Sequence, residues 1–311
     1  DSLSDDIAAL EASIPMPELK CITIETLRNN PPSDDIYDGD PDDVFFYQLS
    51  SGSTGISKAI PERNEAVIAY IHAAKQLNDY SVEDVSLNWL DMDHVGPLLM
   101  CHLRDTYIGM DQVQVPAEKV LADPLLWLDM IEKFRVTQTW TPNFALKLVT
   151  EALVQNPERS WDLSCIKNFK NGGEQVTYAV CKDFVTKLAP FGVEEGNLQP
   201  AYGMAEACTA VIYNNDFTLE TSCHFVKTGS LNGVLEFTDS SDPDSVCFID
   251  HGNVSPGLTI RVVDEHNQPL TERRIGRIQI HGKTIMPGYY NNPDANKEAL
   301  VGDGWYNTGD L

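Results

Sequence analysis

The chain has 311 residues, of which 42% are hydrophobic and 9% aromatic, so it can bury one large core or two medium ones. Its 22 basic and 47 acidic residues give a net charge of −25, which repels nucleic acid and anionic lipid and excludes both as expected partners. No apolar run is long enough to span a membrane. The scattered cysteines form no C-x-x-C pair and the histidines show no metal-binding spacing. We therefore expect a cytoplasmic protein with reduced thiols and no structural metal.

Short apolar runs typical of strands alternate with amphipathic stretches over the first two thirds of the chain. The predicted strands are 45–49, 85–90, 112–115, 137–140 and 166–168. The predicted helices are 63–77, 97–105, 125–134, 143–154 and 178–188. This alternation predicts an α/β fold, a parallel sheet with crossover helices that binds ligands at the carboxyl ends of its strands. After about Thr209, turn clusters at 238–244 and 264–269 predict a β-rich lobe.

Residues 51–58 follow the first predicted strand and have the composition of a phosphate-binding loop. Glycines let backbone N–H groups turn toward an anion, hydroxyls add donors, and a lysine can follow a leaving phosphate. The residues concerned are Ser51, Gly52, Ser53, Thr54, Gly55 and Lys58. Their spacing differs from a Walker A motif, and by composition alone the stretch also suits a flexible linker.

Two later segments carry groups suited to a nucleotide. Tyr202-Gly203-Met204-Ala205-Glu206 combines an aromatic ring that can stack on a flat base with a carboxylate that can hold a hard cation bridging phosphates. Taken alone, the tyrosine also suits a core position and the glutamate a helix start. Near the end of the chain, Asp310 follows a glycine turn and could accept two hydrogen bonds from a ribose diol.

Together, five segments resemble the signatures of adenylate-forming enzymes in the order found in that superfamily, which includes acyl-CoA synthetases, nonribosomal adenylation domains and fatty acyl-AMP ligases. The segments are 51–58, 202–206, 276–282, 288–293 and 305–310, and the resemblance covers about residues 43–311. It implies that a carboxylate attacks the α-phosphate of ATP to give acyl-AMP, and that a thiol then takes the acyl group. The implied partners are a small carboxylic acid, a carrier protein bearing phosphopantetheine and neighbouring synthetase domains, and CoA stays open as the acceptor.

The resemblance also assigns roles to individual residues. It implies an ATP site made of Ser51, Gly52, Ser53, Thr54, Gly55, Lys58, Gly172, Gly173, Glu174, Tyr202, Gly203, Met204, Glu206 and Asp310. Lys58, Glu206 and His94 are the implied catalytic residues, and Glu206 would hold Mg²⁺ through ATP. The implied acid pocket is lined by His94, Val95, Trp140, Phe169, Asn171, Ala201, Thr209 and Ala210.

One departure from the family pattern bears on the subfamily. The residue before the motif glutamate is usually Thr, but here it is Ala205. Losing one charge-assisted hydrogen bond would cost roughly 1.5–3 kcal/mol. The Ala-Glu-Ala version, together with the loop 171–174, resembles fatty acyl-AMP ligases and loading-type adenylation domains of polyketide/nonribosomal peptide hybrid synthetases. The departure therefore points to that branch.

Residues 91–96 bear on the substrate class. In amino-acid-activating domains, an Asp that pairs with the substrate ammonium follows an aromatic residue. If His94 takes the aromatic position, the apolar Val95 stands where those domains have the Asp. We then expect an aryl, keto or fatty acid without an α-amino group. An alignment shifted by two would make Asp93 the partner, which leaves an amino acid open.

We expect three regions: the tail of a preceding variable region at 1–42, an α/β subdomain at 43–208, and a β-rich subdomain at 209–311. We also expect the chain to be an excerpt that lacks the family's mobile C-terminal domain and its bridging lysine, and so to adenylate weakly by itself. The alternative from another class is a nucleotide-binding scaffold that has lost catalysis, with Ala205 as its trace.

Overall fold

The computed structural model describes residues 28–50 and 57–311. Residues 1–39 and 40–311 form separate units. The described part of the first unit, residues 28–39, is exposed. The strands and helices from β1 onward belong to the second unit.

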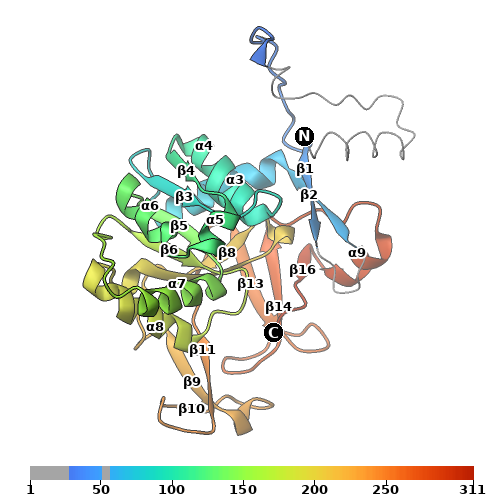
Figure 1. Ribbon diagram of the computed structural model, residues 1–311. Coiled ribbons are helices and arrows are strands. Elements are labelled where there is room, and N and C mark those ends of the chain that lie inside the picture. The colour runs from blue at the N-terminus through green and yellow to red at the C-terminus, as the bar shows by residue number, and fades with distance from the viewer. Residues whose placement is uncertain (1–27, 51–56) are drawn as a thin grey trace. The chain divides into compact units, whose positions relative to one another are not determined.

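A seven-stranded sheet runs through the second unit in the order β12-β8-β7-β6-β5-β3-β4 (Figure 1). Strands β7, β6, β5, β3 and β4 are parallel, and β8 and β12 are added antiparallel at one side. The bounds are β3 (Val85–Asn88), β4 (Asp111–Gln114), β5 (Gln138–Thr141), β6 (Asn168–Asn171), β7 (Leu198–Gly203), β8 (Ala210–Tyr213) and β12 (Asn253–Val254). The predicted parallel sheet with crossover helices is confirmed, although β6 begins where the predicted strand 166–168 ends.

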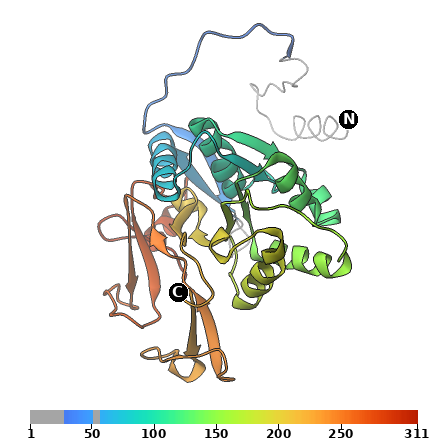
Figure 2. The same cartoon turned by 90° about the vertical axis from the view of Figure 1, so that its left-hand side faces the viewer.

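Helices cover both faces of this sheet (Figure 2). On one face lie α5 (Ala117–Ala122), α6 (Leu126–Phe134), α7 (Asn143–Gln155) and α8 (Tyr178–Leu188), which share a core that includes Trp127, Leu146 and Phe184. On the other lie α3 (Asn64–Asn78), a π-helical segment (Gly96–Leu103) and α4 (Arg104–Ile108), whose core includes Leu99 and Trp140. Apolar side chains at helical spacing form each buried stripe.

Strands β1 (Val44–Ser50) and β2 (Lys58–Arg63) form an antiparallel hairpin outside the large sheet. The prediction that strand 45–49 opens the parallel sheet is therefore wrong. Its apolar run looked like a buried strand, but Phe45, Tyr47 and Leu49 are exposed. The partner strand β2 was not predicted because it contains Pro61, and a proline within a run argues against any strand other than an edge strand.

The predicted β-rich lobe is confirmed as two antiparallel sheets. One has the order β10-β9-β11, and the other β13-β14-β16-β15. Their bounds are β9 (Cys223–Lys227), β10 (Phe237–Thr238), β11 (Ser245–Ile249), β13 (Leu258–Val263), β14 (Arg277–Gly282), β15 (Leu300–Val301) and β16 (Trp305–Asn307), with α9 (Pro293–Ala299) before β15. A third core containing Ile60, Val211, Ile280 and Tyr306 joins β2, β8 and the four-stranded sheet.

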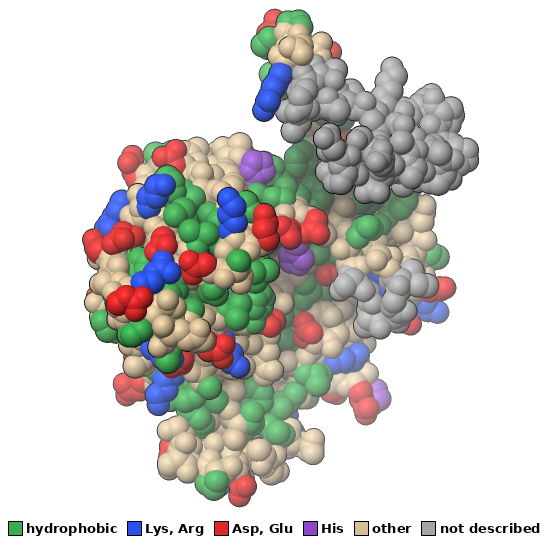
Figure 3. Space-filling view, in the orientation of Figure 1, with side chains coloured by type: hydrophobic (Ala, Val, Ile, Leu, Met, Phe, Trp, Pro, Cys, Tyr) green, Lys and Arg blue, Asp and Glu red, His purple; other side chains and the backbone are tan. Residues whose placement is uncertain are grey.

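The surface agrees with the charge pattern of the sequence. On the face seen in Figure 3, basic side chains lie among acidic ones and form no continuous patch. Within the residues that the structure describes, no helix is long and apolar enough to cross a membrane.

Asp84, just before β3, joins three loops at the amino ends of the parallel strands. Its carboxylate accepts hydrogen bonds from Lys167 Nζ (2.6 Å), Thr137 Oγ1 (2.9 Å) and the Ser81 N–H (2.9 Å). Burial raises the pKa of Asp84, but these hydrogen bonds outweigh it and hold the pKa below the usual 3.8.

We predict that Asp84→Asn lowers the free energy of unfolding by about 1–3 kcal/mol at neutral pH, because a buried charged acceptor is lost. Because the pKa of Asp84 is lower in the folded than in the unfolded protein, the carboxylate stabilises the fold fully above pH 3.8. This stabilisation is lost as the pH falls through the pKa of the folded state. Urea unfolding at several pH values measures it, with Glu83→Gln as an exposed neighbouring control. A loss that does not shrink in acid would contradict the prediction.

Candidate active site

Two cavities meet at the carboxyl end of β7, where Ala201, Tyr202 and Gly203 line both of them. The large cavity has a volume of about 650 Å³ and the small cavity about 110 Å³. The large cavity is lined by residues 173–176, 201–203 and 247–249 and by Ile212, His251, Ile278, Asp310 and Leu311. Residues far apart in the sequence therefore form one wall at the sheet edge where the fold predicts ligands.

Tyr202 and Asp310 are linked inside the large cavity. The Tyr202 hydroxyl donates to Asp310 Oδ2 at 2.6 Å, and its ring lies edge to face with His251 at a centroid distance of 6.4 Å. Burial and Asp310 raise the pKa of Tyr202, so the phenol stays protonated and donates. Burial lowers the pKa of His251, which keeps its ring neutral. The cavity thus combines flat uncharged rings with a carboxylate.

Residues 172–174 press against β7. A Cβ on Gly172 would lie 2.4 Å from the Ala201 carbonyl oxygen, and Gly173 has a φ of +83°, so this approach requires glycine. Glu174 Oε1 accepts from the Phe144 N–H at 2.6 Å, near the start of α7. The Glu174 carboxylate is therefore tied to a helix end while it lines the large cavity.

The small cavity has an aromatic gate on one side. His94 stacks on Trp140 with an interplanar angle of 8° and a centroid distance of 6.5 Å. Its Nδ1 accepts from the Gly96 N–H at 3.1 Å, so the neutral ring carries its proton on Nε2. Burial lowers the pKa of His94, although Asp93 opposes this effect. His94 therefore presents an uncharged N–H donor.

None of the described residues that line the small cavity is Asp or Glu. They are residues 94–96, 172–173, 201–205 and 209–210 together with Met100 and Trp140. Asp93 is exposed and is not among them, and its carbonyl oxygen accepts from Gln48 Nε2. The side chain after His94 is the apolar, buried Val95.

Phe169 and Asn171 do not line the small cavity, contrary to the prediction. Phe169 is fully buried against Trp127 and Phe184, at centroid distances of 5.4 and 5.2 Å. Asn171 is fully buried, and its Nδ2 donates to the Thr141 carbonyl. The reason is the position of β6, which continues to Asn171, so alternation along the strand turns Phe169 toward the core under α6 and α8.

Lys170, between those two residues, is a buried cation that the sequence analysis did not identify. Its ammonium donates to Asn78 Oδ1, Gln199 Oε1 and Asn215 Oδ1 at 2.5 to 2.8 Å and lies 4.7 Å from the Tyr213 ring centroid. Burial and Arg104 lower the pKa of Lys170. A lysine inside a short strand was the available signal, because such a charge is rarely buried without partners.

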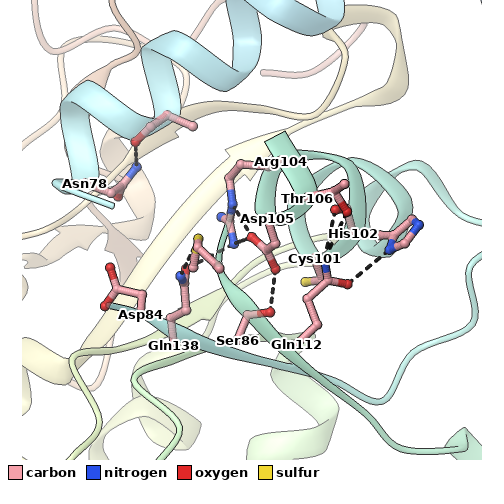
Figure 4. Close-up of polar contacts among 12 residues, drawn as sticks. Asn78, Asp84, Ser86, Cys101, His102, Arg104, Asp105, Thr106, Gln112 and Gln138 are labelled. Atoms are coloured by element: carbon pink, nitrogen blue, oxygen red, sulfur yellow. Dashed lines mark hydrogen bonds and ion pairs between the residues drawn. The ribbon is translucent and has the colours of Figure 1, made fainter. Parts of the chain in front are cut away.

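A polar network surrounds Arg104 and Asp105 (Figure 4). Arg104 is paired with Asp105 at 2.6 Å and donates to Gln138 Oε1 at 3.0 Å, and Asp105 also accepts from Ser86. A void of about 10 Å³ separates this network from Met100 and Trp140, which also line the small cavity. The floor of the cavity is therefore polar and internally paired.

Lys58 and Glu206 meet at Tyr289 rather than in either cavity. The Tyr289 hydroxyl donates to Glu206 Oε1 at 2.8 Å, and Lys58 Nζ lies 4.7 Å from the Tyr289 ring centroid. The Glu206 carbonyl accepts from the Met286 N–H at 2.9 Å. Ser51, Gly52, Ser53, Thr54 and Gly55 lie outside the described residues.

The remaining predicted residues line one or both of the cavities, and Gly173, Ala201, Tyr202 and Gly203 line both. His94, Val95, Trp140, Ala201, Thr209 and Ala210 line the small cavity, as do Gly172 and Met204 of the predicted ATP set. Gly173, Glu174, Tyr202, Gly203 and Asp310 line the large one. Phe248, His251 and Ile278 of the large cavity were not predicted, because no local pattern marks two strand residues and a single histidine in the loop after β11 as ligand contacts.

The family model described as AMP-binding enzyme matches residues 7–290. The chain belongs to the AMP-binding enzyme family. The resemblance to adenylate-forming enzymes is therefore confirmed.

Known proteins of this family resemble the chain over most of its length. Aspulvinone E synthetase from Aspergillus terreus is 33% identical over 276 residues, which is 87% of this chain and 28% of that protein. An adenylation domain of a keto acid-selecting NRPS module, solved bound to keto acyl adenylate, matches with a TM-score of 0.93 and 32% identity, covering 99% of this chain and 56% of that one. McyG A-PCP complexed with phenylalanyl-adenylate gives a TM-score of 0.86 at 30% identity, covering 99% and 45%. The chain thus spans under a third of the curated relative.

We predict that Gly203→Ala lowers the free energy of unfolding by about 1–3 kcal/mol or more and weakens the binding of AMP. The added Cβ would lie 2.0 Å from the Thr209 carbonyl oxygen, so β7 and β8 would have to separate at the wall shared by both cavities. Urea unfolding and nucleotide titration measure these effects.

Gly196→Ala is the matched control for this variant. No heavy atom lies within 4 Å of a Cβ added there, so its free energy of unfolding should stay within about 0.5 kcal/mol of that of the parent. An equal loss in the two variants would contradict the close-approach argument.

Proposed function

We propose that this chain is the nucleotide- and acid-binding part of an adenylation domain that uses Mg·ATP to activate a carboxylic acid without an α-amino group. The proposal is carried by the small cavity, where Val95 follows the His94 gate and no described lining residue is a carboxylate. Transfer of the acyl group to the phosphopantetheine thiol of a carrier protein, beside neighbouring synthetase domains, is part of the proposal. The described cysteines are free thiols, which agrees with a cytoplasmic location.

Electrostatics favours an acid without an α-amino group in the small cavity. An α-ammonium buried in a cavity without a carboxylate would lose its hydration and gain no partner, which is costly. A keto, aryl or fatty acid has no such requirement. Its own carboxylate could accept from the Nε2–H of His94, whose Nδ1 is occupied by Gly96. The keto acid-selecting domain among the similar structures gives this proposal independent support.

The large cavity suits the nucleoside of ATP in this proposal. The ring of Tyr202, with His251 at its edge, offers a flat face for adenine, and Asp310 can accept from a ribose diol. Asp310 would exchange its bond with the Tyr202 hydroxyl for bonds to the sugar, or share its oxygens between them. A separate small cavity beyond Gly203 would then hold the acid next to the α-phosphate.

The group around Tyr289 suits the phosphates and their cation. Glu206 offers the hard oxygen ligand that Mg²⁺ prefers, with one oxygen fixed by Tyr289, so the residues fit this ion. When bound, Mg²⁺ would neutralise phosphate charge. Lys58, with Ser51, Gly52, Ser53, Thr54 and Gly55, would grip the departing pyrophosphate. Such a reaction depends on positioning and charge neutralisation more than on acid–base groups, and His94 would orient the attacking carboxylate.

ATP–pyrophosphate exchange by the full-length protein, with panels of keto, aryl, fatty and amino acids, tests the proposal. We expect exchange with acids that lack an α-amino group. Exchange with amino acids alone would overturn the substrate class. ATP binding without exchange for any acid would favour a nucleotide-binding scaffold, and release of the product onto CoA rather than a carrier protein would identify an acyl-CoA synthetase.

We predict that Val95→Asp lowers kcat/KM for the preferred acid by about 10- to 100-fold, because it adds an unpaired carboxylate beside the carboxylate of the substrate. Val95→Asn has the same shape without the charge and should lose less. Titration with ATP should give the same affinity for both, since Val95 does not line the large cavity. Equal kcat/KM values for the two variants would show that charge at this position does not select the acid.

A further inference from the structure

The reversal between β7 and β8 carries Glu206 and is strained at one residue. Cys208 has φ 66° and ψ −50°, the conformation of a rare and unfavourable γ-turn. The reversal is closed by hydrogen bonds from the Cys208 N–H to the Ala205 carbonyl and from the Met204 N–H to the Thr209 carbonyl, at 3.0 and 2.9 Å. Neither hydrogen bond removes the steric strain that a Cβ causes at this φ and ψ, so another contact must stabilise the conformation of Cys208.

The Cys208 side chain is held by Glu62 of β2. Its Sγ donates to Glu62 Oε2 at 3.1 Å, and the two residues are 0% and 2% exposed. Burial raises the pKa of Glu62 to about 8, Cys208 lowers it and Glu206 adds to the rise, so the carboxyl is neutral at neutral pH. A neutral buried carboxyl bonded to a thiol avoids the cost of a buried unpaired charge.

Glu62 belongs to a row of side chains along one face of β2. Lys58, Ile60 and Glu62 alternate along the strand and share that face. Lys58 lies over Tyr289, Ile60 packs in one core with Ala207, and Glu62 bonds Cys208. The strand therefore contacts the surroundings of Glu206 at both ends.

Glu206 itself is fixed from two directions by other segments. Its carbonyl accepts from Met286 and its carboxylate from Tyr289. Both contacts come from residues after β14, and neither constrains the chain that leaves Glu206 toward β8. On this side of the turn, the contact between Cys208 and Glu62 adds a side-chain hydrogen bond to the two backbone hydrogen bonds that close the reversal.

We propose that Glu62 is a positioning residue that holds Glu206 in its orientation by stabilising the strained conformation of Cys208. Glu62 touches no nucleotide or acid in this scheme and acts through the thiol. The inference rests on the proposed function in one respect, which is that Glu206 binds Mg·ATP. Without the contact, Cys208 would relax toward negative φ and turn Glu206 away from Tyr289, so the affinity for Mg·ATP falls while the acid cavity is unchanged.

The test compares variants of the full-length protein in ATP–pyrophosphate exchange. Glu62→Met keeps the shape of the side chain but cannot accept from a thiol, and Cys208→Ala removes the donor. Each should raise KM for Mg·ATP roughly 5- to 10-fold, the equivalent of one hydrogen bond, with kcat and the KM for the acid changed less than about twofold. Glu62→Gln and Cys208→Ser restore an acceptor and a donor and should recover most of the affinity. The double variant Glu62→Met/Cys208→Ala should be no worse than either single variant.

Ile60→Val is the matched control, because it shrinks the core on the same face of β2 without touching the pair. It should lower the melting temperature and leave KM for Mg·ATP unchanged. Unchanged KM in both Glu62→Met and Cys208→Ala, additive effects in the double variant, or an equal rise in Ile60→Val would overturn the inference. Direct titration with Mg·ATP separates this result from failure of the proposed function, since a weaker affinity in the two variants remains measurable even where no acid supports exchange.

Discussion

The close approach of β7 and β8 is the constraint on which the site depends. At Gly203 the two backbones leave no room for a side chain, and at Gly172 the neighbouring loop approaches the Ala201 carbonyl just as closely. These contacts let three consecutive residues, 201–203, form a thin wall between two cavities. In the proposed function a bulkier wall would keep the acid away from the α-phosphate, because attack of a carboxylate on a phosphate requires contact between the reacting atoms.

The placement of charge follows the same wall. The described lining of the acid cavity has no carboxylate, whereas the buried cations beneath it, Arg104 and Lys170, are held by Asp105 and by amide oxygens. Buried charges with such partners rigidify a core instead of attracting ligands. The polar floor therefore supports Trp140 and His94 without offering a partner to an ammonium group, and the proposed selectivity for the acid rests on the absence of a carboxylate among the described lining residues.

The sequence was most informative where patterns are local. Helices 125–134, 143–154 and 178–188 were placed within about a residue of α6, α7 and α8, because apolar residues recur at helical spacing. The strand predicted at 166–168 begins and ends too early because the asparagines and lysine of β6 conceal its burial. The link between Tyr202 and Asp310, 108 residues apart, and the pair Glu62–Cys208, 146 apart, depend on tertiary folding that no local pattern encodes. The family signatures placed Tyr202 and Asp310 in one ATP site without predicting the hydrogen bond between them, and nothing in the sequence marked the second pair.

In the proposed function, the two binding tasks share β7, the reversal that follows it and the loop before α8, and otherwise use different segments. The gate and the lining of the acid cavity come from residues 94–96, Trp140 and 209–210, whereas Tyr289, Lys58 and Glu206 connect the hairpin to the β-rich sheet through a separate core. Substitutions at Val95 or Ala210 therefore change the shape offered to the acid without moving the proposed phosphate groups. Substitutions at Glu62 or Tyr289 would instead affect the proposed phosphate groups and not the shape offered to the acid. In the proposed function, the choice of acid can therefore vary on this fold while nucleotide binding is kept.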